Sequence, residues 1–148
     1  MSARFFLDTN IFVYAFDARA PAKRKRAMAL IRDAGDTGNG VVSYQVVQEF
    51  FNVALRKFSV PMSAAEAEQY LMTVFRPLLA VHSSPALYLN AIEIAGRYRL
   101  RWFDSLIVAG AIESDCQVLF SEDLQHGQKI GAVRIENPFL AKPAPRRT

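Results

Sequence analysis

Apolar and polar positions alternate along the chain in blocks that predict strands and helices in turn. Short stretches that are apolar on both faces predict strands at 3–7, 40–43, 78–82 and 117–121, with a last short strand in VRIEN at 133–137. Apolar residues at helical spacing predict helices at 10–16, from Pro21 to Gly35, at 44–58, from Ser63, at 84–97 and at 103–114. Strands of this kind separated by helices are typical of a parallel sheet covered by helices. We therefore expect an α/β fold: a three-layer α/β/α sandwich around a central parallel sheet of four to five strands.

The length and composition predict one domain. The chain has 148 residues, of which 51% are hydrophobic and 22% charged, as in ordinary globular proteins. No interdomain linker or repeat interrupts residues 1–140, whereas 141–148 (AKPAPRRT) is a Pro-rich basic tail that we expect to be disordered. The N-terminus is neither a signal peptide nor an anchor, and the longest apolar run, LIVAGAI, is far too short to span a membrane. We expect a cytoplasmic protein that binds no membrane.

Four acidic residues stand beside apolar runs: Asp8 in RFFLD, Glu49 in VVSYQVVQEFF, Asp104 in WFDSLIVAGAI and Asp123 in VLFSED. Burying a carboxylate costs several kcal/mol unless something compensates its charge, and the apolar residues beside these acids supply no basic partner. A divalent cation with oxygen ligands would compensate all four. The only cysteine, Cys116, excludes an intrachain disulfide and a thiolate zinc site built from this chain alone. The sequence thus predicts an acidic, metal-dependent active site.

The predicted elements bring these acids to one edge of the sheet. Asp8 and Asp123 follow strands directly, and ligands of parallel sheets bind beyond the carboxyl ends of strands. Glu49 lies one helical turn after Gln45, so both side chains can project from one helix face. Each acid also has an ordinary explanation: Asp104 as a charge in the first turn of a helix, Asp8 as an Asx turn, and Asp123 as a loop residue. Their joint occurrence favours a site.

The charge balance adds a polyanionic substrate to the hypothesis. The formal net charge is +4, and without the four candidate acids 18 basic residues face 10 acidic ones of the 14 present. A basic surface around an acidic, metal-binding site suits a nucleic acid whose backbone is held by Lys and Arg. The same balance also fits a merely basic globular protein.

The ordered set of motifs resembles the PIN domain family, in particular the VapC-type ribonuclease toxins of bacterial type II toxin–antitoxin pairs. The similar segments cover nearly the whole chain: FLDTNIFVYAFD, VVSYQVVQEFFNV, WFDSLIVAGAIESDC and VLFSEDLQHGQKI. The resemblance implies a PIN-like sandwich and a metal-dependent endoribonuclease (a hydrolase acting on phosphodiester bonds). It also implies a homodimer and a cognate antitoxin that covers the active site.

Site roles follow from that resemblance. It makes Asp8, Glu49, Asp104 and Asp123 the catalytic acids and the ligands of one or two Mg²⁺ or Mn²⁺ ions. Asp8 and Asp104 would bind directly, and Glu49 and Asp123 directly to a second ion or through water. Asn10, Ser121 and Gln45 would be polar supports; Ser121 stands where many relatives have Thr, which keeps the hydroxyl.

Several surface residues are candidates for partner contacts. Arg97, Arg99 and Arg101 precede Asp104 and are the better candidates for RNA binding, including binding of transfer RNA or another structured RNA. The basic run at 23–26 is more typical of a solvated face. Tyr98 and Trp102 can stack on unpaired bases, although core packing is the commoner role of a tryptophan. Phe12, Val13 and Phe16 can contact an antitoxin or belong to the core.

Other mechanisms and functions stay open from the sequence. His82, in an apolar strand, and His126, in a loop, offer a metal-independent acid–base pair. A PIN-fold nuclease acting in RNA processing or on DNA would need no antitoxin. A binding module without catalysis is a third class, although the complete acidic set argues against it.

Overall fold

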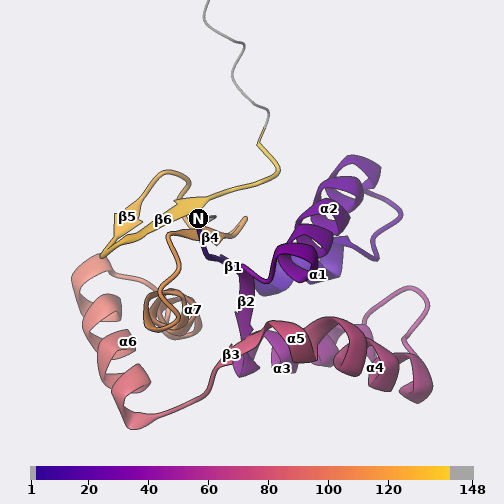
Figure 1. Ribbon diagram of the computed structural model, residues 1–148, viewed down its shortest axis with the longest axis horizontal. Coiled ribbons are helices and arrows are strands. Elements are labelled where there is room, and N and C mark those ends of the chain that lie inside the picture. The colour runs from indigo at the N-terminus through magenta and orange to yellow at the C-terminus, as the bar shows by residue number, and fades with distance from the viewer. Residues whose placement is uncertain (1–2, 141–148) are drawn as a thin grey trace, which may run out of the picture.

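The computed structural model describes residues 3–140, so the expected disordered tail at 141–148 lies outside the described residues. Figure 1 shows the elements in chain order. The strands are β1 (Phe5–Leu7), β2 (Gly40–Ser43), β3 (Leu79–Val81), β4 (Val118–Phe120), β5 (Lys129–Ile130) and β6 (Val133–Glu136). The helices are α1 (Thr9–Tyr14), α2 (Pro21–Thr37), α3 (Tyr44–Ala54), α4 (Ala64–Tyr70), the π-helical turn η1 (Leu71–Phe75), α5 (Arg76–Leu78), α6 (Pro85–Tyr98) and α7 (Trp102–Glu113).

The strands form one sheet in the order β3-β2-β1-β4-β6-β5. Every neighbouring pair from β3 to β6 is parallel, whereas β5 pairs antiparallel with β6. The expected parallel sheet of four to five strands is therefore present, with one further strand at its edge. That strand has only two residues, too few to show a period of alternation, so the apolar pattern did not predict it.

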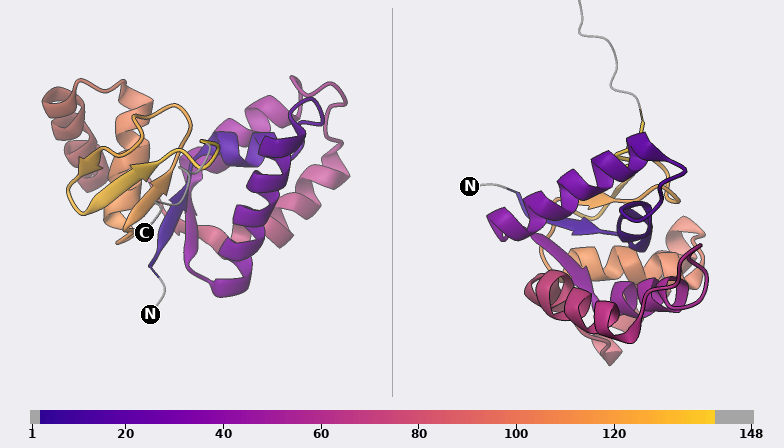
Figure 2. Two further views of the ribbon diagram at one scale, coloured as in Figure 1. Left: turned by 90° about the horizontal axis from the view of Figure 1, so that it is seen from above. Right: turned by 90° about the vertical axis from the view of Figure 1, so that its right-hand side faces the viewer.

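Helices cover both faces of the sheet, as the sequence predicts. Figures 1 and 2 show α6 and α7 on one side and α1 to α5 on the other. Two glycines show how closely the helices approach the sheet. A Cβ added at Gly110 of α7 would stand 3.5 Å from the Phe6 ring, and one added at Gly40 would meet the Ala34 Cβ at 2.1 Å. Gly40 is thus required where α2 crosses β2.

An aromatic cluster joins α1 and α3 to the π-helical turn. Phe50 lies at its centre, with its ring 6.4 Å from that of Phe12, 5.2 Å from Phe75 and 5.2 Å from Tyr70. Phe12, Phe50 and Phe75 are fully buried. This packing fixes α3, and with it Glu49, relative to the end of β1.

Three helix ends differ from the sequence prediction. The helix expected at 10–16 ends at Tyr14. The helix from Pro21 runs through Gly35 to Thr37, because Gly38 rather than Gly35 takes the left-handed cap conformation, with φ 71°. The helix expected at 44–58 ends at Ala54 and continues as turns. The start of α4 is as predicted, with a capping box between Ser63 and Glu66. Within the described part of the chain, no helix combines the length and the apolar character needed to cross a membrane.

The connections create a crevice beside β1. From β1 the chain moves outward to β2 and β3, and then returns through α6 and α7 to β4 on the other side of β1. Parallel sheets bind ligands where the strand order reverses in this way, beyond the carboxyl ends of the strands. That point lies between Asp8, after β1, and Ser121, after β4.

Candidate active site

Asp8 is the most buried of the candidate acids. It follows β1 and caps α1, where its Oδ1 accepts a hydrogen bond of 2.7 Å from the Thr9 amide. The Ser121 hydroxyl donates to its Oδ2 at 2.7 Å. Burial raises the pKa of Asp8 to about 6; these two hydrogen bonds lower it, and the nearby Glu49 and Asp123 carboxylates raise it further. The cap and the site are thus two roles of one side chain.

Glu49 projects from α3 toward the same crevice. Its Oε2 accepts a hydrogen bond of 2.9 Å from the Thr9 hydroxyl, and its Oε1 one of 2.7 Å from the Gln45 amide. The same Gln45 nitrogen also donates to the carbonyl oxygen of Phe103, 3.0 Å away. Gln45 therefore connects Glu49 to the first turn of α7, which carries Asp104.

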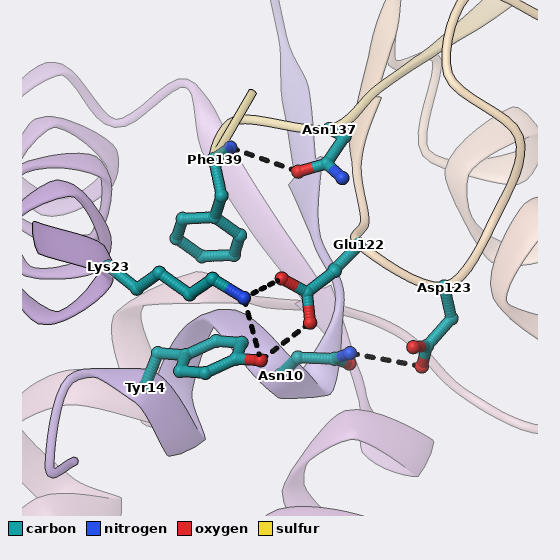
Figure 3. Close-up of polar contacts among 7 residues, drawn as sticks. All are labelled: Asn10, Tyr14, Lys23, Glu122, Asp123, Asn137 and Phe139. Atoms are coloured by element: carbon teal, nitrogen blue, oxygen red, sulfur yellow. Dashed lines mark hydrogen bonds and ion pairs between the residues drawn. The ribbon is translucent and has the colours of Figure 1, made fainter. Parts of the chain in front are cut away.

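Asp123 lies in the loop after β4 and is exposed. The Asn10 side chain, from α1, donates a hydrogen bond of 3.0 Å to its Oδ2. Figure 3 shows the Asn10 and Asp123 side chains pointing toward each other. Helix α1 therefore contributes to the placement of Asp123 as well as Asp8.

Asp104 is half-buried in the first turn of α7. Burial raises the pKa of its carboxyl above the usual value, and the Asp123 and Glu49 carboxylates add to the rise while Arg101 opposes it. The four acids are therefore coupled electrostatically, although they come from four separate parts of the sequence.

Among the described residues, no Lys, Arg or His forms an ion pair with any of the four acids. Within residues 3–140, the three ion pairs join Arg19 to Asp17, Lys23 to Glu122 and Arg134 to Glu136, and none involves the four acids. Across the same residues, no three His, Cys, Asp or Glu side chains stand close enough to hold one ion between them. The donors nevertheless fit Mg²⁺ or Mn²⁺, because they are oxygens and because Mg²⁺ sites commonly use one or two carboxylates completed by water and substrate phosphate.

A hollow of about 550 Å³ opens beside the acids. Glu49, Asp123, Asn10 and Thr9 line it together with residues of α1 and α3. Glu49 and Asp123, which the family resemblance makes ligands of a second ion or ligands through water, therefore border space that a substrate can enter.

A second polar cluster adjoins the acids and was not predicted. In Figure 3, the Glu122 carboxylate lies between Lys23 of α2 and Tyr14 of α1. Its Oε1 accepts a hydrogen bond of 2.5 Å from the Tyr14 hydroxyl, and its Oε2 lies 2.6 Å from the Lys23 ammonium nitrogen. We refer to Tyr14, Lys23 and Glu122 as the Glu122 cluster. The sequence signal was the spacing: Tyr14 follows Asn10 by one helical turn, and Glu122 precedes Asp123 directly.

The predicted basic and aromatic residues lie around the start of α7. Arg97, Arg99 and Arg101 are exposed, and Arg99 ends α6 in a left-handed conformation. Tyr98 packs partly against the core. The expectation that Trp102 belongs to the core is wrong: it is 39% exposed, with its ring 6.0 Å from Tyr88. Trp102 is the first residue of α7, whereas residues 105–111 of the same helix are buried.

Two other expectations change with the structure: those for the apolar residues near α1 and for His82. Phe12 is fully buried and so is unavailable to a partner, whereas Phe16 is 43% exposed and Val13 half-buried. His82 lies just beyond β3, exposed and stacked on Tyr44. His126 accepts a hydrogen bond from the Asn137 amide. Neither histidine forms a hydrogen bond with the four acids in the described part of the chain.

The pattern of this site and fold agrees with a family comparison: the PIN domain model matches residues 5–129. The chain belongs to the PIN domain family. This match spans every element that carries a candidate acid, and it confirms the family suggested by the motifs. No curated protein matches the chain closely enough to count as a relative.

Solved structures that are similar to this chain include proteins described as parts of toxin–antitoxin systems. A toxin–antitoxin complex from Klebsiella pneumoniae is similar with TM-score 0.65 and 17% identity, over 89% of this chain and 95% of that one. The Mycobacterium tuberculosis toxin VapC20, described as cleaving the sarcin–ricin loop, is similar with TM-score 0.55 and 19% identity, over 80% and 91%. DNA-bound VapBC from Salmonella typhimurium is similar with TM-score 0.58 and 20% identity, over 91% and 98%. At these identities the likeness establishes a shared fold.

Proposed function

We propose that this PIN domain is a metal-dependent endoribonuclease that hydrolyses RNA phosphodiester bonds and acts as the toxin of a VapBC-type pair. The observation that carries the proposal is the group of four carboxylates at the strand-order reversal, with no Lys or Arg paired to any of them in the described residues. Bringing such a group together destabilises the fold, and binding of a divalent cation offsets that cost.

The side chains divide into holding and proton-accepting roles. When bound, Mg²⁺ or Mn²⁺ supplies a lowered pKa for a bound water and charge neutralisation at the phosphate. Asp8 and Asp104, the two acids whose pKa burial raises, would hold it. Thr9 and Gln45 orient Glu49 from both of its oxygens. Asp123 lines the hollow, and Glu49 or Asp123 would orient the attacking water and take its proton.

RNA would be held by basic residues near the acids. Arg97, Arg99 and Arg101 are exposed, and Arg101 is close enough to Asp104 to lower the pKa of its carboxyl. Phosphate groups that approach Arg101 therefore approach the acidic site as well. Exposed Trp102 is free to stack on an unpaired base.

The toxin role rests on the neighbours and on one apolar hollow. The neighbours are described as toxin–antitoxin proteins, which supports a cognate antitoxin as a partner. A homodimer and action in the cytoplasm belong to the same proposal. A hollow of about 520 Å³ has Phe16 and the 83% exposed Val60 in its lining. Val13, Asp17 and Val53 line both this hollow and the one beside the acids. An antitoxin segment bound in the first would reach the second.

Cleavage assays test this function. Purified protein would be incubated with bulk transfer RNA, and separately with single-stranded and double-stranded DNA, in Mg²⁺ or Mn²⁺ and in EDTA. The proposal expects cutting of RNA that stops in EDTA and in Asp104→Asn. The matched control is Asp36→Asn, which removes an exposed carboxylate on α2 far from these contacts and keeps activity.

Each outcome selects a function. Preferential cutting of DNA would replace the ribonuclease with a DNA nuclease of the same fold. RNA cutting that persists in EDTA would point to His82 and His126. Binding of RNA with no cutting in either metal would leave the non-catalytic binding module.

A further inference from the structure

Asp123 has little of its own to hold it in place. It is exposed, and within residues 3–140 its side chain has one hydrogen bond, from Asn10. Its neighbour Leu124 is buried, so the loop is anchored on one side of Asp123. What anchors the other side is Glu122.

Helix α1 contacts this loop twice, through residues one helical turn apart. Asn10 and Tyr14 project from the same helix face, as i and i+4 residues do, and they bind Asp123 and Glu122 respectively. Figure 3 shows these two contacts side by side. A shift of the loop along α1 would break both together.

Lys23 closes the Glu122 cluster into a ring. Its ammonium nitrogen lies 2.6 Å from Glu122 Oε2 and donates a hydrogen bond of 3.3 Å to the Tyr14 hydroxyl. Both oxygens of Glu122 are therefore occupied. An isolated exposed ion pair contributes little, but a network with fixed geometry contributes more.

The segment after β6 packs over this ring. The Phe139 ring meets the Tyr14 ring edge-on at 5.0 Å, and the Lys23 ammonium nitrogen lies 5.7 Å from the Phe139 centroid. The Phe139 amide donates a hydrogen bond of 2.9 Å to the Asn137 side chain, which holds the segment in a turn. Aromatic cover over a charged contact limits the water that can compete for it.

We propose that Glu122 is a positioning residue: held by Tyr14 and Lys23, it fixes the loop so that Asp123 faces Asn10 and the other acids. The inference rests on the proposed metal-dependent nuclease for its consequence, but the ordering of the loop is measurable without any activity. Residues that orient a ligand typically alter metal affinity or activity by about 10- to 100-fold when replaced.

The test uses variants that remove single groups from the full-length protein. Tyr14→Phe removes the hydroxyl, Glu122→Gln the charge, and Lys23→Met the ammonium, whereas Lys23→Arg keeps the charge. The matched control is Glu136→Gln, because Glu136 is a similarly exposed carboxylate paired with Arg134 on β6. Three quantities are measured: amide hydrogen exchange of residues 121–126, Mn²⁺ affinity by calorimetry, and kcat and KM for RNA.

We expect faster exchange in 121–126, by about tenfold, in the first three variants, with Mn²⁺ affinity and kcat about 10- to 100-fold lower and KM unchanged. Lys23→Arg should retain most of the protection from exchange, the Mn²⁺ affinity and the kcat of the wild type. Glu136→Gln should leave all three unchanged. Unchanged exchange and Mn²⁺ affinity in Tyr14→Phe and Glu122→Gln would overturn the proposal, as would equal losses in Glu136→Gln. A wild-type protein that binds no Mn²⁺ and cuts no RNA would refute the proposed function, while the exchange rates would still decide the role of Glu122.

Discussion

Neighbouring carboxylates in this protein have opposite surroundings. Glu122 is paired: burial raises its pKa, but the Lys23 ammonium and the Tyr14 hydroxyl outweigh this, and its pKa lies below the usual value. Asp8, across the same crevice, is buried and forms no ion pair with any residue between 3 and 140, and its pKa rises to about 6. Glu122 and Asp123 are adjacent in the sequence, yet within residues 3–140 only Glu122 forms an ion pair.

The difference separates a structural carboxylate from a functional one. The fold provides a lysine for Glu122, whose charge is then stable without any ligand. Around Asp8, the part of the chain that the structure describes provides hydrogen-bond donors, from Thr9 and Ser121, which orient the carboxylate without neutralising it. A charge left in this state destabilises the empty protein and favours whatever cation binds there.

The largest expected effect is on catalysis. Asp8→Asn should reduce RNA cleavage by at least about 100-fold, since loss of a metal ligand removes several kcal/mol of transition-state stabilisation. The asparagine can still accept from the Thr9 amide and contact Ser121, so the fold is kept. Initial rates at saturating Mn²⁺ measure this, and retention of more than a tenth of the wild-type rate would contradict it.

The same substitution should stabilise the metal-free protein. Because the pKa of Asp8 is about 6 when folded and 3.8 in the reference state, the unfolded chain loses this proton first. Wild-type stability therefore falls as pH rises from about 4 to about 6, and stays lower above that. We expect Asp8→Asn to gain about 1 to 3 kcal/mol over the wild type at pH 7, and almost nothing at pH 4.

Urea unfolding in EDTA at both pH values measures this gain. Asp36→Asn is the control, since an exposed carboxylate should show no such pH-dependent difference. A destabilised Asp8→Asn at pH 7 would mean that an unnoticed partner compensates the Asp8 charge.

Substitutions of arginines should change RNA affinity less than Asp8→Asn changes cleavage, and only arginines near the acidic site should have an effect. Arg97→Gln and Arg101→Gln should each weaken RNA binding several-fold and lower the slope of log affinity against log salt by about 0.7. Arg24→Gln, in the exposed basic run of α2, is the matched control. Fluorescence anisotropy in EDTA at several salt concentrations tests this without cleavage. An equal effect of Arg24→Gln would place the RNA more broadly over the basic surface.

The smallest expected effect is on the stability of the fold when the ion pair of the Glu122 cluster is removed. Lys23→Met should lower Tm by no more than about 3 °C, because exposed pairs contribute little to global stability. Differential scanning calorimetry measures it, with Lys23→Arg as the control. A much larger fall would show that the Glu122 cluster is part of what holds the domain together.

The sequence predicted those features that depend on nearby residues. The apolar runs predicted β1, β2, β3, β4 and β6, and the capping residues Ser63 and Ser84 predicted where two helices begin. The placement of Asp8 and Asp123 followed from the general rule that strand ends of a parallel sheet share one edge. These are local patterns combined with one topological rule.

What the sequence missed depends on contacts between distant elements. Tyr14 and Glu122 are separated by 108 residues, and nothing near either one indicates the other. Likewise, nothing near Thr9 in the sequence indicates that its hydroxyl donates a hydrogen bond to Glu49, 40 residues away. The exposure of Trp102 depends on where α7 begins relative to the sheet edge, which residue type alone does not reveal.

The most direct test of the account is a calorimetric titration of the metal-free protein with Mn²⁺, at pH 6 and pH 7.5, for the wild type, Asp8→Asn and Asp36→Asn. The account predicts saturable binding that releases protons at pH 6, where part of the Asp8 population is protonated, and affinity at least about tenfold lower in Asp8→Asn alone. Absence of Mn²⁺ binding at millimolar concentration, or equal binding by wild type and Asp8→Asn, would contradict the claim that these unpaired carboxylates form a metal site.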